Sequence, residues 1–500
     1  MGKLDRVAQV RAERQPCADL GNGYYRNPII AGNYADPSVV RVGADYYMVQ
    51  SMAPGVLLWH SRDLVNWRPL GNALDVELGD IWAPELVRHG DLYYLYLPVV
   101  QPRGEGQRPR FANYVCTASD PAGPWSEPVD LHVDGYIDPG HVADRDGRRY
   151  LYVSAGMAAP LSADGLAVTG EMERVYAGWP YPDEWVAECF CLESPKFVWR
   201  GDWLYLVSAQ GGTWGPATSH MAVVARARSP LGPWENSPHN PLVHTGSREE
   251  KWWSQGHGTL IDDVEGRWWL VYHAVERGYA TLGRPVLLLP VEWTDDGWPI
   301  VRQAADGLLA KPAGEDVGHG LPLSDDFAAS ALGVQWRRTG AGGRAAYRCE
   351  DGALLMAASG TAAPGAGLAD WDGVAYVASS PVNHSYEVVV EIDVPAGAEA
   401  GLLLQDGRGG AAIGAGTGDG RAWAFVDGRP ASQAECGSRV WLKLWHLEHD
   451  VVAFWSADGV AWAKFSRSGR AETGRPLWIT LYASGEGVVR FRGWRYLGLD

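Results

Sequence analysis

The first three hundred residues contain one pattern that recurs five times in the same order. Each copy has a short polar head, an aromatic run of strand type and a closing turn, and the heads lie at Asp36, Pro84, Asp138, Glu193 and His257. Helical periodicity is almost absent from residues 27–302. A repeat of about 50 residues built from short strands is typical of a β-propeller blade, so five heads predict five blades. A meandering β-sandwich with chance similarity is the alternative.

The polar heads predict a cluster of acidic groups. The innermost strand of every propeller blade lies against the central axis, so heads that are far apart in sequence should face one another. Asp36, Asp138 and Glu193 would then share a small rim with His257. Crowded carboxylates repel one another, so chemistry explains this set better than packing does. A proline follows each of the two Asp residues directly, which predicts extended backbone at a strand start, although a single Asp-Pro pair is equally typical of a turn.

The stretches around these heads resemble glycoside hydrolase family 43, whose members are five-bladed β-propellers. The resemblance covers about residues 24–302 and is carried by Asn27–Pro37, Trp82–Pro84, Tyr136–Pro139, Glu193–Pro195 and Gly256–Gly258. It implies hydrolysis of a glycosidic bond with inversion at the anomeric carbon. It also implies that Asp36 is the general base, that Glu193 is the general acid, and that Asp138 orients Glu193 and raises its pKa.

Inversion explains why the two carboxyl groups need different surroundings. One protonated carboxyl protonates the leaving oxygen while an ionised one activates water on the opposite face, at a separation of roughly 6.5–9.5 Å. Glu193 must therefore keep its proton near neutral pH, and a neighbouring carboxylate such as Asp138 together with partial burial would achieve this.

The resemblance implies roles for several further residues. Trp82 would form a wall of the sugar site, with core packing as the alternative, and Arg284 would contact substrate and base, with a surface ion pair as the alternative. His257 would lie in the axial channel near a structural calcium ion or its waters, or would be an axial histidine without metal. Met52 stands where related β-xylosidases often carry an aromatic residue, so this wall of the pocket is expected to differ. The aromatic segment 179–188 is predicted to be a loop that covers the site.

Composition limits the partners and the compartment. The net charge of −17 argues against binding to nucleic acid or to an anionic membrane surface, and an oligosaccharide remains as the expected partner. The start of the sequence lacks the apolar region of a secretory signal, and we expect a cytoplasmic protein, either monomeric or a homo-oligomer, that requires no cofactor. The cysteines are interpreted as small buried hydrophobic residues in a reducing compartment, with a redox role for Cys189 and Cys191 as the alternative.

The composition and strand pattern change after the repeats. We expect an N-terminal extension at 1–23, the propeller at 24–302, a linker at 303–324 and a β-sandwich of the jelly-roll or concanavalin-like type at 325–500. The last region resembles the sandwich appended to family β-xylosidases, which implies that it packs on the propeller and can lend a residue that narrows the pocket. A separate sugar-binding module is the alternative, although Trp441 and Trp445 alternate with apolar residues as core positions do.

These observations predict an all-β, exo-acting inverting glycosidase that releases terminal pentose units. β-D-xylosidase and α-L-arabinofuranosidase activity on short hemicellulose oligosaccharides are both implied by the resemblance. A sugar-binding propeller without catalysis is one alternative. A glycosidase of the same fold that acts on another furanoside, such as a retaining fructan enzyme, is another.

Overall fold

The computed structural model defines most of the 500-residue chain. It describes residues 13–51, 55–74, 78–101, 109–301, 307–339, 346–362, 373–406, 413–426, 429–471 and 474–499. The predicted all-β class is confirmed, since the helical elements among these residues are two 3-10 turns, η1 (Ser154–Gly156) and η2 (Ala280–Leu282). Within the same residues, no helix has the length and apolar character needed to cross a membrane.

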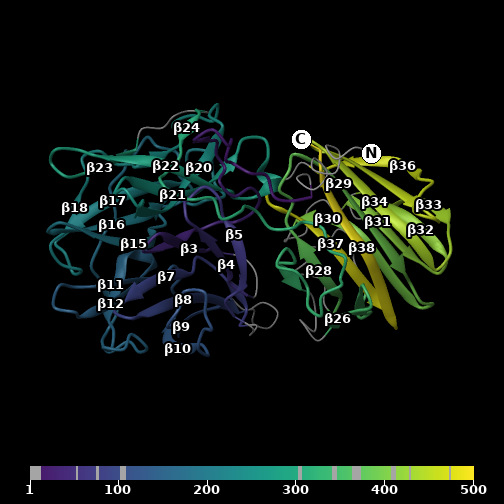
Figure 1. Cartoon of the computed structure of the whole chain (residues 1–500), viewed down its shortest axis with the longest axis horizontal. Helices are drawn as coiled ribbons and strands as arrows, with labels where there is room; N and C mark the ends of the chain where they lie inside the picture. Colours follow the sequence, from purple (N-terminus) through teal and green to yellow (C-terminus); the bar gives the residue numbers. More distant parts are fainter. Residues whose placement is uncertain are drawn as a thin grey trace.

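Five consecutive antiparallel sheets form the first part of the molecule (Figure 1). The first sheet contains β2 (Ser38–Val42), β3 (Asp45–Val49), β4 (Leu57–Ser61) and β5 (Arg68–Asn72). The second contains β6 (Asp80–Ile81), β7 (Glu85–His89), β8 (Leu92–Gln101), β9 (Arg110–Ala118) and β10 (Val129–Asp134). The third contains β11 (Gly140–Ala143), β12 (Arg149–Val153), β13 (Met157–Pro160) and β14 (Glu173–Arg174).

The remaining two sheets of this part follow the same plan. The fourth contains β15 (Glu193–Arg200), β16 (Trp203–Gln210), β17 (Met221–Ala227), β18 (Glu235–Asn236) and β19 (Val243–His244). The fifth contains β20 (Trp252–Asp262), β21 (Trp268–Glu276), β22 (Val286–Trp293) and β23 (Pro299–Val301). Most strands that follow one another in sequence pair in antiparallel fashion, whereas β6 and β7 both pair with β8, and β18 and β19 both pair with β17.

One strand of each sheet lies on the inside, and these five strands form a closed ring. They contact one another in the order β2, β7, β11, β15, β20 and back to β2. The segment before β2 closes the ring, because Ile29 and Ile30 form backbone hydrogen bonds with Val286 of β22. The aromatic residues of the repeats fill the space within and between the sheets, and Trp59, Trp67 and Trp298 are fully buried.

Two seven-stranded sheets form the second part (Figure 1). One consists, in spatial order, of β25 (Arg338–Thr339), β28 (Ala375–Ser379), β37 (Leu477–Gly485), β30 (Ala398–Asp406), β31 (Ile413–Gly418), β32 (Arg421–Val426) and β33 (Arg429–Glu435). The other consists of β26 (Tyr347–Glu350), β27 (Ala353–Ala357), β38 (Val488–Gly498), β29 (Ser385–Asp393), β34 (Arg439–Leu447), β35 (Asp450–Ser456) and β36 (Ala463–Arg470). Alternate residues of β29 are buried, and the two sheets pack against each other.

The segments expected to be an extension and a linker pack together. β1 (Tyr24–Tyr25) pairs with β24 (Leu309–Ala310), and Arg14 bridges to Pro322. Lys311 forms ion pairs with Asp19 and with Asp63 of the first sheet, the latter at 3.0 Å. The described residues of 307–324 are therefore fixed against the first sheet.

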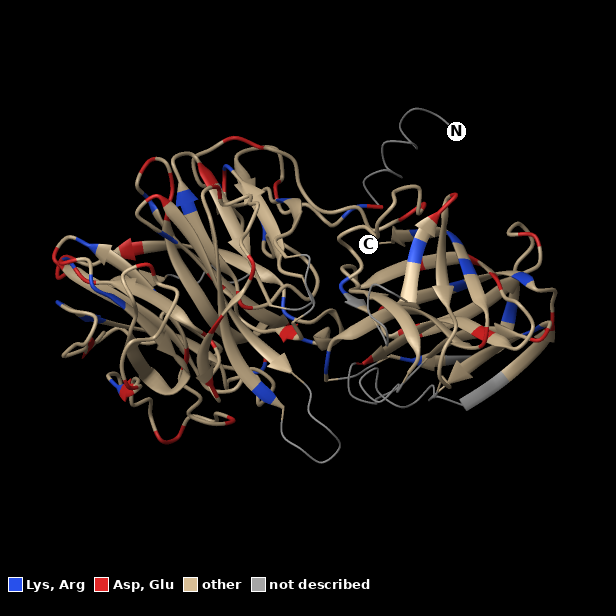
Figure 2. Ribbon diagram, turned by 90° about the horizontal axis from the view of Figure 1, so that it is seen from below, with Lys and Arg blue, Asp and Glu red and all other residues tan. Residues whose placement is uncertain are grey.

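Direct contacts join the two parts. Glu276 of β21 forms an ion pair with His384 at 2.9 Å, and the ring of Tyr279 stacks on His384 with centroids 3.8 Å apart. Arg337 reaches from the segment before β25 to the first sheet and is buried. Acidic and basic residues are interspersed along the ribbon of both parts (Figure 2).

Candidate active site

A residue with left-handed backbone lies close to or within each inner strand: two residues before β2, β7 and β11, second in β15, and in the middle of β20. The φ angles are 59° at Asp36, 41° at Ala83, 56° at Asp138, 57° at Ser194 and 55° at His257. Such a conformation costs a non-glycine residue roughly 1–2 kcal/mol, and it is concentrated at functional sites. The repeat that was visible in the sequence is therefore accompanied by left-handed backbone at or next to every head, although other non-glycine residues such as His132 and Ser254 also have positive φ.

The predicted extended backbone at Asp36 and Asp138 is wrong. Proline disfavours a helical conformation in the preceding residue, but tertiary contacts override this preference here. The Asp36 amide donates a hydrogen bond to His273 Nδ1 (3.1 Å), and Asp138 Oδ2 accepts one from the Ser194 amide (3.1 Å). The equivalent positions in the second and fourth sheets are Ala83 and Ser194, one residue away from the heads expected there.

The Asp36 carboxylate accepts hydrogen bonds from Arg284 and Ser51 and lies against two imidazole rings. Arg284 contacts both of its oxygens, with Nη1–Oδ1 at 2.9 Å and Nη2–Oδ2 at 3.3 Å. The Nδ1 atoms of His257 and His273 lie 3.2 and 3.1 Å from Oδ1, and the Ser51 hydroxyl donates to Oδ2. Burial alone would raise the pKa of Asp36, but the charge of Arg284 and the two histidines hold it well below its usual range. This carboxyl group is ionised at neutral pH.

Asp138 and Glu193 lie in the opposite electrostatic environment. Burial and the nearby charge of Asp36 raise the pKa of Asp138 to about 7. Burial, followed by the charges of Asp138 and Asp36, raises the pKa of Glu193 well above its usual range, although Arg284 opposes the shift. One ligand atom each from Asp138, Glu193 and His257 lie within 4.8 Å of one another. The cluster therefore shifts the two carboxyl groups in opposite directions, with the pKa of Asp36 lowered and that of Glu193 raised.

The position of Arg284 excludes a surface ion pair. Its side chain is only 14% exposed, and its amide donates to Asn33 Oδ1 at 3.1 Å. Gly283 precedes it with φ of 79°, and a Cβ atom there would lie 2.4 Å from the Asn33 Cβ, so only glycine fits. The Trp214 ring lies 5.7 Å from the guanidinium carbon and is 41% exposed.

Of the two residues predicted to line the wall of the sugar pocket, the structure describes Trp82 but not Met52. Trp82 is half-buried, meets Phe111 edge to face at 5.8 Å and precedes Ala83, whose amide donates to the Ser51 hydroxyl. This places Trp82 next to the network around Asp36. Met52 lies outside the described residues.

Several residues of the site were not found in the sequence. They are Ser51, His220, His273, Lys196 and Glu85. Lys196 and Glu85 form a buried ion pair, and Glu85 also accepts a hydrogen bond from the Ser38 hydroxyl. Ser38 and Lys196 each follow the proline at the start of an inner strand, so a polar residue directly after that proline was an available signal. His273 belongs to β21, the second strand of its sheet, and the repeat pattern gave no indication that it faces the axis.

The axial histidines do not form a calcium cage. Ligand atoms of Asp36, His257 and His273 lie within 4.8 Å of one another, and Nε2 of both histidines has no hydrogen-bond partner among the described residues. Calcium takes six to eight oxygen ligands, whereas this set offers two nitrogens and a carboxylate that already binds Arg284. The residues present do not fit direct calcium ligation.

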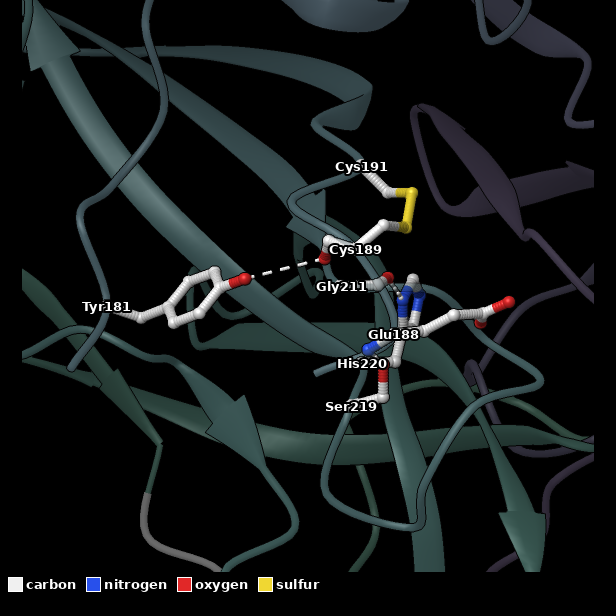
Figure 3. Close-up of a disulfide and its surroundings, with 7 residues drawn as sticks. All are labelled: Tyr181, Glu188, Cys189, Cys191, Gly211, Ser219 and His220. Carbon is white, nitrogen blue, oxygen red and sulfur yellow. Dashed lines mark hydrogen bonds between the residues drawn. A yellow bond between two sulfur atoms is a disulfide. The ribbon is translucent and has the colours of Figure 1, made fainter. Parts of the chain in front are cut away.

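The loop before β15 holds a disulfide bond between Cys189 and Cys191 (Figure 3). Cys191 is exposed and Cys189 is half-buried, so their interpretation as reduced, buried residues is wrong, and among the other cysteines only Cys116 is buried. The Tyr181 hydroxyl donates to the Cys189 carbonyl at 3.4 Å, and the Glu188 amide donates to Ser219 Oγ at 2.8 Å. The bond lies two residues before Glu193.

Comparison with known proteins identifies the family. The family model for glycosyl hydrolases family 43 matches residues 25–299, which is more than half of the chain and includes all five sheets up to the start of β23. The chain belongs to this family.

Curated members of family 43 are similar over part of their length. The non-reducing end α-L-arabinofuranosidase of Bacteroides ovatus is 34% identical over 63% of this chain and 61% of its own length. The xylan 1,3-β-xylosidase of a Vibrio species is 31% identical over 55% of this chain and 57% of its own length. The matched region thus spans about three fifths of these relatives.

Solved family 43 structures match over nearly the whole chain. A family 43 protein of Bacillus licheniformis has a TM-score of 0.80 at 25% identity and covers 95% of this chain and 100% of its own. The xylan β-1,4-xylosidase of Bacillus halodurans has a TM-score of 0.79 at 25% identity, with coverage of 94% and 99%. This likeness extends past residue 299, so it includes the two seven-stranded sheets.

Proposed function

We propose that this family 43 protein is an exo-acting, inverting glycosidase that releases terminal pentose units from short hemicellulose oligosaccharides. The observation that supports it most strongly is that the same cluster lowers the pKa of Asp36 and raises the pKa of Glu193, as a base and an acid require. Relatives named as arabinofuranosidase and xylosidase support a pentose in the terminal position.

We further propose that the five sheets are the blades of a propeller spanning about 24–302 and that residues 325–500 form a β-sandwich. The closed ring of inner strands supports the first assignment, and two packed seven-stranded sheets support the second. The cytoplasmic location, the oligomeric state and an indirect calcium contact of His257 stay predictions.

In the proposed reaction, water attacks the anomeric carbon while the bond to the leaving oxygen breaks. Asp36 accepts a proton from this water, and Glu193 gives its own proton to the leaving oxygen. Arg284 and the Ser51 hydroxyl orient the carboxylate of Asp36, and Asp138 keeps Glu193 protonated until the leaving group departs. Solvent restores both protonation states after the sugar leaves.

Trp82 and Arg284 are proposed to contact the sugar. Trp82 is half-buried and can offer a ring face or edge to the apolar side of a pentose. Arg284 retains donor capacity beyond its two bonds to Asp36, since its Nε has no hydrogen-bond partner among the described residues. Met52 is proposed for the same wall on the resemblance alone.

Hydrolysis of p-nitrophenyl β-D-xyloside and p-nitrophenyl α-L-arabinofuranoside tests the substrate class. We expect release from at least one of them, and proton NMR of the first product of xylobiose hydrolysis should show the α-anomer of xylose. Absence of hydrolysis of both aryl glycosides and of xylobiose would overturn the pentosidase assignment. First appearance of the β-anomer from xylobiose would overturn inversion.

A further inference from the structure

Arg337 belongs to the second part of the chain, yet its side chain ends beside the first sheet. Its Nη1 donates to the Asn33 carbonyl at 2.6 Å, and its Nη2 donates to the Ser51 carbonyl at 3.0 Å. The guanidinium carbon lies 4.3 Å from the centre of the Tyr34 ring, and the residue is 2% exposed. A charged group this deeply buried is retained only when its hydrogen bonds are well satisfied, which makes its position specific.

Both carbonyl acceptors belong to residues that hold the catalytic ion pair. The Ser51 hydroxyl donates to Asp36 Oδ2, and the Asn33 side chain accepts the amide hydrogen of Arg284. The Arg337 guanidinium therefore fixes the backbone of Asn33, which binds Arg284, and the backbone of Ser51, which binds Asp36. Arg337 contacts the carbonyl groups of Asn33 and Ser51 directly, and these two residues connect it to Arg284 and Asp36.

The segment that carries Arg337 is itself anchored in the second part. Asp325 Oδ2 accepts hydrogen bonds from Trp336 Nε1 at 2.8 Å and from Gln335 Nε2 at 3.1 Å. The Trp336 ring packs on Trp494 of β38 with centroids 5.1 Å apart. The position of Arg337 is therefore set by the packing of the two seven-stranded sheets.

We propose that Arg337 is a positioning residue for the reaction, through which the second part of the chain holds Asp36 and Arg284 in their productive arrangement without touching substrate. The proposal rests on the proposed function, because it assumes that Asp36 acts as the base. It predicts that the second part contributes to turnover even where substrate binding is unaffected.

The test compares three variants of the full-length protein. Arg337→Met removes both donors while keeping much of the apolar stem, and Arg337→Lys keeps the charge but cannot bond two carbonyls in the same fork geometry. Arg348→Met is the matched control, since Arg348 lies in the same part of the chain and forms an exposed ion pair with Glu350. Each is measured for kcat, KM, the pH dependence of kcat/KM and the thermal midpoint.

For Arg337→Met we expect kcat to fall about 30- to 100-fold with KM within about threefold, because a displacement near 1 Å of a reacting group has costs of this order. The acidic limb of the pH profile of kcat/KM should move to higher pH, because Asp36 separates from the groups that keep it ionised. These are Arg284, His257 and His273, with Asp138 and Glu193 opposing them across the ring. Arg337→Lys should recover part of kcat, and Arg348→Met should equal the wild type.

Hydrogen–deuterium exchange gives a readout that needs no substrate. Peptides that contain Asp36 and Ala83 should exchange faster in Arg337→Met, because the amides of both residues take part in the network around Ser51 and His273. If Arg337→Met does not fold, the kinetics and exchange of Arg337→Lys decide the question.

The proposal is overturned if folded Arg337→Met keeps kcat within twofold, or if its loss of activity matches its loss of folded protein and the acidic limb of its pH profile is unchanged. If the wild type hydrolyses neither pentoside, the proposed function is refuted instead. In that case unchanged exchange at Asp36 and Ala83 would still refute the positioning role.

Discussion

The first and fourth sheets each bring one carboxyl group to the same cluster, and the two groups meet different neighbours. Asp36 of the first sheet contacts a guanidinium, two imidazoles and a hydroxyl. Glu193 of the fourth sheet lies near two other carboxyl groups. Asp36 is buried and Glu193 is half-buried, and desolvation raises the pKa of both, so it cannot separate them. The partners decide which one keeps its proton, and this division is what acid–base catalysis requires.

The largest expected effects come from substitutions of Asp36 and Glu193, measured on two substrates that differ in their leaving group. Asp36→Asn should reduce kcat/KM about 1000-fold for both xylobiose and 2,4-dinitrophenyl xyloside, because every substrate needs the activated water. Glu193→Gln should cost about as much with xylobiose but only about tenfold with the dinitrophenyl substrate, whose leaving group departs without a proton. Steady-state kinetics on both substrates measure the difference.

Asp91→Ala, in an exposed turn of the second sheet, serves as the control and should match the wild type. Equal losses for Glu193→Gln on the two substrates would contradict its role as the acid.

A smaller effect is expected when the guanidinium is removed. Arg284→Met should lower kcat/KM about 100-fold, because the pKa of Asp36 then rises and its carboxylate loses two hydrogen bonds. The base is active only when ionised, so a higher pKa moves the acidic limb of the pH profile to higher pH.

Arg277→Met tests whether loss of any nearby arginine has the same consequence, since Arg277 pairs with Glu249 on the surface. An acidic limb that stays in place in Arg284→Met would show that other groups keep Asp36 ionised.

The smallest effect concerns the neighbour that raises the pKa of Glu193. Asp138→Asn removes the second-largest cause of that shift, so the pKa of Glu193 should fall. The acid is active only when protonated, and the basic limb should therefore move by about one pH unit to lower pH, with a loss of about tenfold at pH 8. The rate near pH 5 should change less.

Asp146→Asn, in an exposed turn of the third sheet, is the control for this substitution. A basic limb that moves to higher pH in Asp138→Asn would reverse the assignment.

The polar heads located the candidate site correctly because the repeat shows which residues lie at corresponding points of the inner strands. The pattern predicted that Asp36, Asp138, Glu193 and His257 would meet, and the structure brings them together. It did not predict their left-handed backbone, because the preference of a residue before proline is local, whereas the contacts that override it come from other sheets.

Residues outside the repeated heads were not accessible to the same reasoning. Arg337 and His273 reach the site through packing between distant segments, for which a single sequence holds no periodic signal. The disulfide between Cys189 and Cys191 was also not predicted, because the cysteines were interpreted as buried hydrophobic residues whereas these two lie in an irregular, partly exposed loop.

The position of the ring closure has a consequence for how the protein matures. Asp36 lies six residues beyond Ile30, and Arg284 lies two residues before Val286, so the backbone bonds that close the ring also bring base and guanidinium together. During synthesis, all five sheets must emerge before these two groups can meet. A nascent or partly folded chain therefore has no assembled active site, and catalytic competence appears only when the last sheet docks on the first.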